Sequence, residues 1–305
     1  MTRTTLDPKQ DVVFKLLFSR PSNKRLLIAL LTAILEPTSP IVDVEVLNPE
    51  VTKESVEAKG TVLDILVRLS DGRQVNLEMQ ATAHGWCMSR GVYYCARVFA
   101  SQLSRGEAYE ELNPVVGIFI LDFRALPGER YHSKFELLEV HEHARLTDDL
   151  TIHVVELPKL PREPPGSDSP AVLKWSRFLA ARSDEELEQV AMSDPDLREA
   201  KTALEKLSQD PTARRLAEER ERAAWNHRYT MAQERKEGRE EGRVEGREEG
   251  RVEGRVEALR EAVEQLCSAL GVAITEPQRA SLSATTPDAM QALLHHIAVH
   301  RQWPR

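Results

Sequence analysis

Hydrophobic residues recur at two different spacings along the first 160 positions, and this separates predicted helices from predicted strands. Apolar residues at three- and four-residue steps predict helices at about residues 8–19, 26–35 and 86–105. Short alternating or continuous apolar runs predict strands at 41–47, 62–67, 75–80, 115–121, 133–140 and 150–157. This order of elements predicts a mixed α/β fold, in which helices flank a central mixed sheet.

A proline-rich segment follows the last predicted strand. Pro158, Pro161, Pro164, Pro165 and Pro170 exclude both a regular helix and a regular strand there. The remainder of the chain has a helical pattern. We therefore expect an α/β domain at 1–160, a helical domain at 161–233, and a repeat helix with a C-terminal helical tail at 234–305.

A Glu-Gly-Arg triplet recurs every four residues in the last of these regions, with glycines at 238, 242, 246, 250 and 254. Each glycine costs a helix about 1 kcal/mol relative to alanine. The period also places like charges one turn apart, and only Glu240 with Arg243 and Glu248 with Arg251 form favourable pairs. A second helix packed on the glycines would offset these costs, which predicts self-association through residues 238–258. A flexible charged spacer is the alternative.

Composition limits the classes of protein to which the chain can belong. No apolar run approaches the roughly 18 residues of a membrane span, and the first residues lack the apolar core of a secretion signal. We expect a cytoplasmic protein without a membrane partner. Three widely spaced cysteines fit neither a disulfide framework nor a four-ligand zinc site.

The net charge of −8 argues against a protein that binds nucleic acid tightly and without sequence preference. Residues 1–160 alone carry 18 basic and 22 acidic side chains. Arg68, Arg73, Arg90 and Arg97 surround the second and third predicted strands, so a local basic rim is compatible with this balance.

Two acidic residues, Asp64 and Glu78, lie on consecutive predicted strands. If residues 70–72 form a three-residue loop with glycine last, Asp64 lies directly opposite Glu78, with Cβ atoms about 5 Å apart. Gln80 then shares their face of the sheet. Opposed carboxylates repel one another unless a divalent cation lies between them. A two-residue loop at 71–72 would instead place Asp64 on the other face, as an ordinary surface charge, and both registers stay open.

Several separated segments carry a family resemblance: Asp11 to Phe18, Leu63 to Ile65, Asn76 to Gln80, and a following helix with Arg90, Tyr93 and Tyr94. In this order they resemble the recombination-promoting nuclease and transposase branch of the PD-(D/E)XK nuclease superfamily. The resemblance covers about residues 7–123. It implies a restriction-endonuclease-like core, and the glycine and arginine repeat is also familiar from such proteins.

The resemblance further implies a Mg²⁺-dependent DNA endonuclease linked to recombination or transposition, with Mn²⁺ as a substitute metal. Asp64 and Glu78 would be the metal ligands, and Gln80 takes the place where the superfamily usually has lysine. Asp11 matches an acidic position that completes the site. Lys15, one helical turn away, is a minor candidate for contacting phosphate or pairing with Asp11.

Two other hypotheses compete with an active endonuclease. A glutamine at position 80 supplies no positive charge to the reacting phosphate, so the protein could be a catalytically weak or inactive nuclease fold that binds DNA or regulates an assembly. The third hypothesis is a helical assembly protein that uses its amino-terminal domain only as a scaffold.

Overall fold

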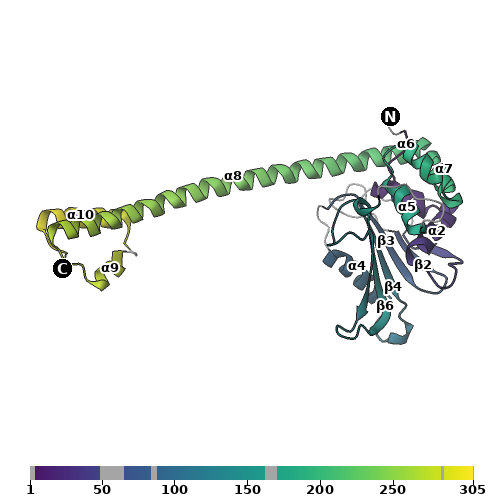
Figure 1. Cartoon of the computed structure of the whole chain (residues 1–305), viewed down its shortest axis with the longest axis horizontal. Coiled ribbons are helices and arrows are strands. Elements are labelled where there is room, and N and C mark those ends of the chain that lie inside the picture. The colour runs from purple at the N-terminus through teal and green to yellow at the C-terminus, as the bar shows by residue number, and fades with distance from the viewer. Residues whose placement is uncertain (1–3, 49–64, 84–87, 162–169, 283–284, 305) are drawn as a thin grey trace. The chain divides into compact units, whose positions relative to one another are not determined.

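The computed structural model describes residues 4–48, 65–83, 88–161, 170–282 and 285–304, except the side chains of residues 227 and 228 (Figure 1). In the described part of the chain, six strands form one mixed sheet in the order β1-β2-β3-β4-β6-β5. Their bounds are Val44–Val46 for β1, Ile65–Leu69 for β2, Gln74–Gln80 for β3, Val115–Leu121 for β4, His132–Leu138 for β5 and Arg145–Glu156 for β6.

Parallel strands lie at the centre of the sheet, because β4 pairs in parallel with both β3 and β6. The neighbouring pairs β1–β2, β2–β3 and β5–β6 are antiparallel. The predicted mixed α/β sheet is therefore confirmed. The apolar run at 115–121 forms β4, and all seven of its residues are buried, as expected for a central strand covered on both faces.

Helices cover both faces of the sheet, and Figure 1 shows α4 on one side with α2 and α5 on the other. The helices α1 (Asp11–Ser19), α2 (Lys24–Leu35), α5 (Ala171–Ala180), α6 (Asp184–Met192) and α7 (Pro195–Gln209) contribute to one hydrophobic core with Ile118 and Ile120 of the sheet. The helix α4 (Met88–Ala100) packs on the opposite face, where Cys95 contacts the cluster of Val115, Phe119 and Val154.

Glycines permit the close approach of α4 to the sheet. A Cβ atom added to Gly117 of β4 would lie 2.4 Å from the Cys95 sulfur, and one added to Gly91 of α4 would lie 3.0 Å from a ring carbon of Phe119. The first distance is shorter than carbon and sulfur atoms tolerate, and the second is a tight contact. A side chain at Gly117 would therefore push α4 away from β4.

The first helix is shorter than predicted. It begins at Asp11 rather than near residue 8, because Asp7 forms a separate turn in which its carboxylate accepts a hydrogen bond from the Lys9 amide at 3.0 Å. The described residues also include the short 3₁₀ helices η1 (Pro21–Asn23), η2 (Tyr109–Glu111) and η3 (Leu157–Lys159).

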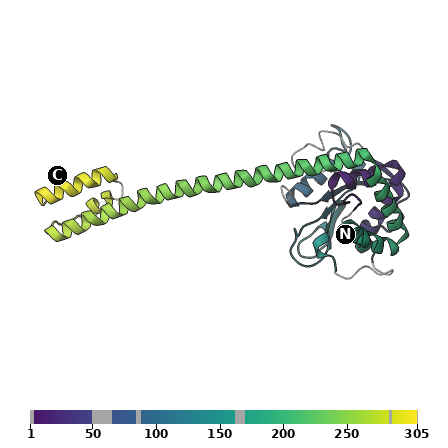
Figure 2. The ribbon, with the colours of Figure 1, turned by 90° about the horizontal axis from the view of Figure 1, so that it is seen from above.

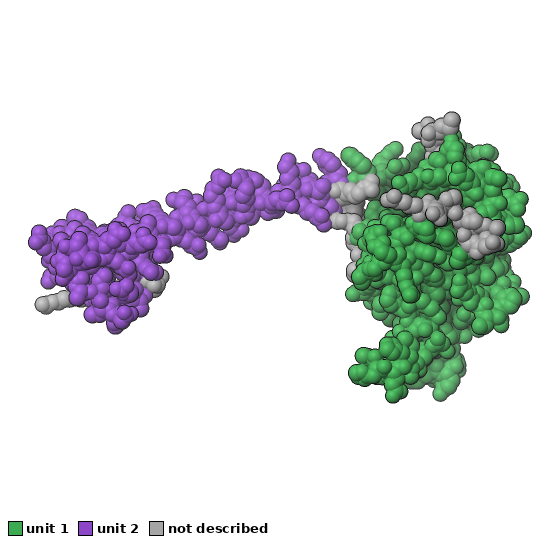
Figure 3. All heavy atoms as spheres, in the orientation of Figure 1, with its two compact units in different colours: residues 1–227 green, residues 228–305 purple. Residues whose placement is uncertain are grey.

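Contacts divide the chain into two compact units, residues 1–227 and residues 228–305 (Figure 3). The helices α5, α6 and α7, which follow the proline-rich segment, share the core of the first unit. The sequence predicts separately folding domains that end at residues 160 and 233, and these boundaries stay predictions.

The second unit has a small core of its own. It contains the later part of α8 (Pro211–Leu270), together with α9 (Glu276–Leu282) and α10 (Pro287–His300) (Figure 2). Val263, Cys267, Leu282 and Ile297 form its buried cluster. The glycine repeat lies inside α8, and its side chains are exposed. None of the described helices combines the length and apolar composition needed to cross a bilayer.

Candidate active site

The hairpin of β2 and β3 has a three-residue loop, one of the two loops that the sequence leaves open. The Leu69 amide donates a hydrogen bond to the Arg73 carbonyl at 2.8 Å, and Gly72 adopts a left-handed φ of 92°. Ile65 pairs with Leu77, which is the register that the three-residue loop predicts. Asp64 lies outside the described residues, so its place opposite Glu78 stays a prediction.

Glu78 is a buried carboxylate in the middle of the sheet, with 2% of its surface exposed. It pairs in register with Phe119 of β4, on the face that α4 covers. Asn76, two residues earlier on the same face, donates a hydrogen bond from Nδ2 to Glu78 Oε1 at 2.9 Å. A buried carboxylate is strongly destabilising without such partners, so Asn76 helps to hold Glu78 in place.

Asn76 was missed as a candidate by the sequence reasoning, although the two-residue period of a strand places it beside Glu78. Its side chain is 1% exposed, and its Oδ1 atom has no hydrogen-bond donor among the described residues. The site therefore presents a buried amide oxygen next to a buried carboxylate.

The charge of Glu78 acts on the thiol of Cys95 in α4. Burial, and secondly the negative charge of Glu78, raise the pKa of the Cys95 thiol from 9.0 to about 12. Cys95 is consequently a neutral thiol at physiological pH, and it serves neither as a nucleophile nor as a thiolate ligand.

Gln80 ends β3 and is half-buried. Its side-chain Nε2 atom donates to the Thr82 backbone carbonyl at 3.1 Å. The backbone carbonyl of Gln80 accepts a hydrogen bond from the Asp122 amide at 3.0 Å. The Asp122 carboxylate in turn pairs with Lys9 Nζ at 2.8 Å. These contacts join the carboxyl ends of β3 and β4 to the segment that precedes α1.

Asp11 forms a bidentate ion pair with Arg220 of α8. Arg220 Nε lies 2.8 Å and Nη2 lies 2.6 Å from Asp11 Oδ2, and both side chains are mostly buried. The Val12 amide donates to Asp11 Oδ1 at 2.8 Å. Lys15, the other accessory candidate, is buried at 4% exposure. The 209 positions between Asp11 and Arg220 explain why no local pattern revealed the pair.

Ion pairs with acidic neighbours neutralise two arginines of the predicted basic rim. Arg68 pairs with Glu45 at 3.0 Å, and Arg73 pairs with Asp71 at 2.8 Å. The Arg90 guanidinium lies 5.3 Å from the centre of the Tyr94 ring, in a cation–π contact. Arg97 is exposed on α4.

The donor atoms at the hairpin suit a hard divalent cation. Carboxylate and amide oxygens, such as those of Glu78 and Asn76, are the ligands that Mg²⁺ and Mn²⁺ prefer. Among the residues that the structure describes, no group of three or more His, Cys, Asp or Glu side chains gathers in a metal-binding arrangement. A complete ligand set at Glu78 therefore requires residues beyond those described, and Asp64 is the predicted one.

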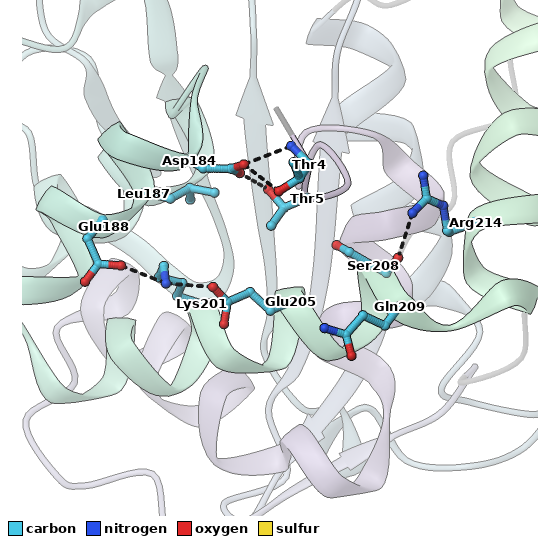
Figure 4. A pocket seen from close by; sticks show the side chains of 10 residues that line it. All are labelled: Thr4, Thr5, Asp184, Leu187, Glu188, Lys201, Glu205, Ser208, Gln209 and Arg214. Atoms are coloured by element: carbon cyan, nitrogen blue, oxygen red, sulfur yellow. Dashed lines mark hydrogen bonds and ion pairs between the residues drawn. The ribbon is translucent and has the colours of Figure 1, made fainter. Parts of the chain in front are cut away.

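A second polar site lies between the amino terminus and α6 and α7, in a pocket of about 460 Å³ (Figure 4). The Asp184 carboxylate accepts hydrogen bonds from the Thr4 amide at 2.8 Å and from the Thr5 hydroxyl at 2.8 Å. Lys201 is bound by Glu188 and Glu205, each at 2.7 Å. The hydrogen bonds from Thr4 and Thr5 to Asp184 show that this pocket fastens the amino-terminal segment to α6.

Comparison with protein families finds a match over most of the chain. Residues 8–234 match the family described as PD-(D/E)XK nuclease family transposase, a range that includes the hairpin, α4 and Arg220. Comparisons with curated proteins and with solved structures find no match.

Proposed function

Because the chain belongs to the PD-(D/E)XK nuclease family transposases, we propose that it is a metal-dependent DNA endonuclease that acts in recombination or transposition. The observation that carries this proposal is the burial of Glu78, held by Asn76, on a hairpin in which Ile65 pairs with Leu77. The Glu78 carboxylate and the Asn76 amide oxygen lie together there, and both are ligands that a hard divalent cation binds.

Each residue has a distinct task in this proposal. Asp64 and Glu78 hold Mg²⁺, or Mn²⁺ in its place, and Asn76 keeps Glu78 in the binding orientation. A cation held there would polarise the phosphate and lower the pKa of a nearby water. Gln80 positions water or phosphate by hydrogen bonds alone, since it carries no charge.

Cleavage of plasmid DNA with and without Mg²⁺ tests the proposal. We expect Asp64→Ala and Glu78→Ala to lower the cleavage rate by about 100-fold or more, as loss of a transition-state contact does. Glu110→Ala, which removes an exposed carboxylate from η2, is the matched control and should cleave normally. Cleavage without divalent metal, or full activity in the Glu78 variant, would contradict the proposal.

The uncharged side chain of Gln80 also favours a second candidate, a nuclease fold that binds DNA or regulates an assembly with little catalysis. The two candidates differ in the response to Gln80→Lys, which restores the charge usual at this position. We expect the variant to cleave about tenfold faster or more, since it adds a donor to the developing negative charge. Metal binding without cleavage in both proteins would support the second candidate.

We further propose self-association through residues 238–258. The five repeat glycines lie in α8 with open space around each Cβ position, and Val244 and Val252 are 57% and 45% exposed. Glycines four apart on an exposed helix allow a second backbone to approach closely. Removal of residues from Glu234 onward should lower the number of chains per particle in solution, and a number that is the same for the full-length and truncated chains would contradict this proposal. The cytoplasmic location expected from the sequence also stays a prediction.

A further inference from the structure

The strand β5 is an edge of the sheet in the part of the chain that the structure describes. It pairs with β6 on one side and is the last strand in the sheet order. Apolar side chains are exposed along this hairpin, and these are Phe135 45%, Leu137 42%, Leu138 42%, Val140 79% and Leu146 80%. An exposed apolar edge strand offers unpaired backbone groups to another strand.

Alternation of the backbone identifies which groups of β5 point outward. The Glu156 amide donates to the Tyr131 carbonyl at 2.7 Å, in the same register that pairs His132 with Val155. Since hydrogen-bonding direction alternates along an antiparallel strand, residues 133 and 135 also face β6. The amides and carbonyls of His132, Lys134 and Glu136 therefore point away from the sheet.

The charged side chains of Lys134 and Glu136 favour one register for pairing with an identical strand. If two copies of β5 pair antiparallel about a two-fold axis at Phe135, Lys134 of each copy lies opposite Glu136 of the other. An axis at Lys134 or at Glu136 would oppose two identical charges, which destabilises strand pairing. A lysine normally protects an edge strand from pairing, but Lys134 already pairs with Glu136 of its own strand at 2.7 Å, and in the first register it also lies opposite Glu136 of the other copy.

The same register brings the exposed aromatic ring to the axis. Phe135 of one copy faces Phe135 of the other in a non-hydrogen-bonded pair, where Cα atoms are about 4.5 Å apart and side chains contact most closely. The pair of rings buries apolar area that the single chain leaves in water.

We propose that β5 is a homodimer interface, in which two copies of the chain join their sheets through antiparallel β5 strands centred on Phe135. The interface is isologous, as a two-fold dimer requires. It depends neither on nuclease activity nor on association of α8.

A cysteine at the proposed axis tests the register in the full-length chain. Cys87 is replaced by serine in every variant, and Cys95 and Cys267 are buried. Phe135→Cys should form an interchain disulfide on mild oxidation with oxidised glutathione, because the expected Cα separation suits a disulfide. Val140→Cys, more exposed and on the same hairpin, is the control. It should stay a monomer on a denaturing gel, since this register separates its two copies by about ten residues of strand.

Charge reversal provides a second test that does not depend on oxidation. Lys134→Glu and Glu136→Lys each place like charges opposite one another, and each should weaken self-association by about tenfold or more. Mixing the two variants restores both attractive pairs, so the mixture should form heterodimers of nearly wild-type affinity. Circular dichroism of each variant checks that it is folded.

Absence of a disulfide in the Phe135→Cys chain, or disulfides of equal yield at positions 135 and 140, would overturn the proposal. So would a mixture of the charge variants that associates no better than either alone. Association through α8 would survive these substitutions unchanged, so the two interfaces are distinguished.

Discussion

At the scale of single residues, buried charges in this protein are held by specific partners. Glu156 and Lys159 pair at 2.5 Å, and neither side chain is more than 1% exposed. Glu156 also accepts the Ala125 amide at 2.6 Å, and Lys159 donates to the Leu126 carbonyl at 2.8 Å. This pair fixes the loop after β4. The hydrogen bonds with Ala125 and Leu126 complete the partners of the two buried charges. Glu78 differs, because its buried neighbours include an amide oxygen that still lacks a described donor.

Arg220→Ala should lower the free energy of unfolding by about 1–3 kcal/mol, since it leaves the mostly buried Asp11 carboxylate without its charged donor. Arg215→Ala on the same helix removes an exposed pair with Glu219 and should change stability by about 0.5 kcal/mol or less. Denaturant titration of both variants measures the difference. Equal effects would show that the Asp11 pair adds no more than a surface contact.

Asp184 predicts a pH dependence of stability at the residue level. Hydrogen bonds from Thr4 and Thr5 lower its pKa from 3.8 to about 2. Because the folded pKa is the lower one, the stabilisation is complete above the unfolded value and is lost as the pH falls towards 2. Asp184→Asn should be less stable than the native chain at pH 7, and the gap should close between about pH 4 and 2. A gap that stays constant over this range would contradict the assignment.

At the scale of elements, α8 remains helical through a repeat that disfavours a helix. The predicted favourable pairs are present, with Arg243 Nε 2.9 Å from Glu240 and Arg251 Nε 3.0 Å from Glu248. Each pair is exposed, so solvent screening leaves it only a weak contribution to the stability of the helix. Two such pairs do not offset five glycines, which is why a packing partner for this segment is proposed.

Replacement of Gly242, Gly246 and Gly250 by alanine separates the helix from its proposed interface. No atom lies within 4 Å of a Cβ at these positions, so each change should stabilise the helix by about 1 kcal/mol. If a second helix packs on the glycines, association should weaken while helicity rises. Circular dichroism and sedimentation measure the two effects. Association that is unchanged or stronger in the triple variant would show that the glycines are not the interface.

At the scale of the whole molecule, two cores predict two unfolding transitions. Phe178 lies in the core of the first unit and Ile297 in the core of the second, and both are fully buried. Ile297→Ala should destabilise the second unit by about 2–5 kcal/mol, and Phe178→Ala should destabilise the first by about 3–5 kcal/mol. In calorimetry each variant should shift one transition only. A single transition that both variants shift would mean that the units unfold together.

Local patterns in the sequence were enough to predict much of the fold. The seven apolar residues of β4 indicate a central strand, and the glycine at 72 indicates the loop that sets the register of Leu69 and Arg73. Such features depend on residues near one another in the chain, so periodicity and turn chemistry reveal them. The family resemblance rested on the same local motifs, and the match over residues 8–234 confirms it.

By itself, the sequence determined most element types, limited the hairpin to two registers and named the candidate acids Asp64, Glu78 and Asp11. Only the tertiary structure decided between the two registers, paired Asp11 with Arg220, placed α5 to α7 on the core of the sheet and made β5 an edge strand. The physical reason is the separation along the chain of the residues that interact. A strand's period is set by its own residues, whereas strand order and distant ion pairs arise only when elements far apart in the chain pack together.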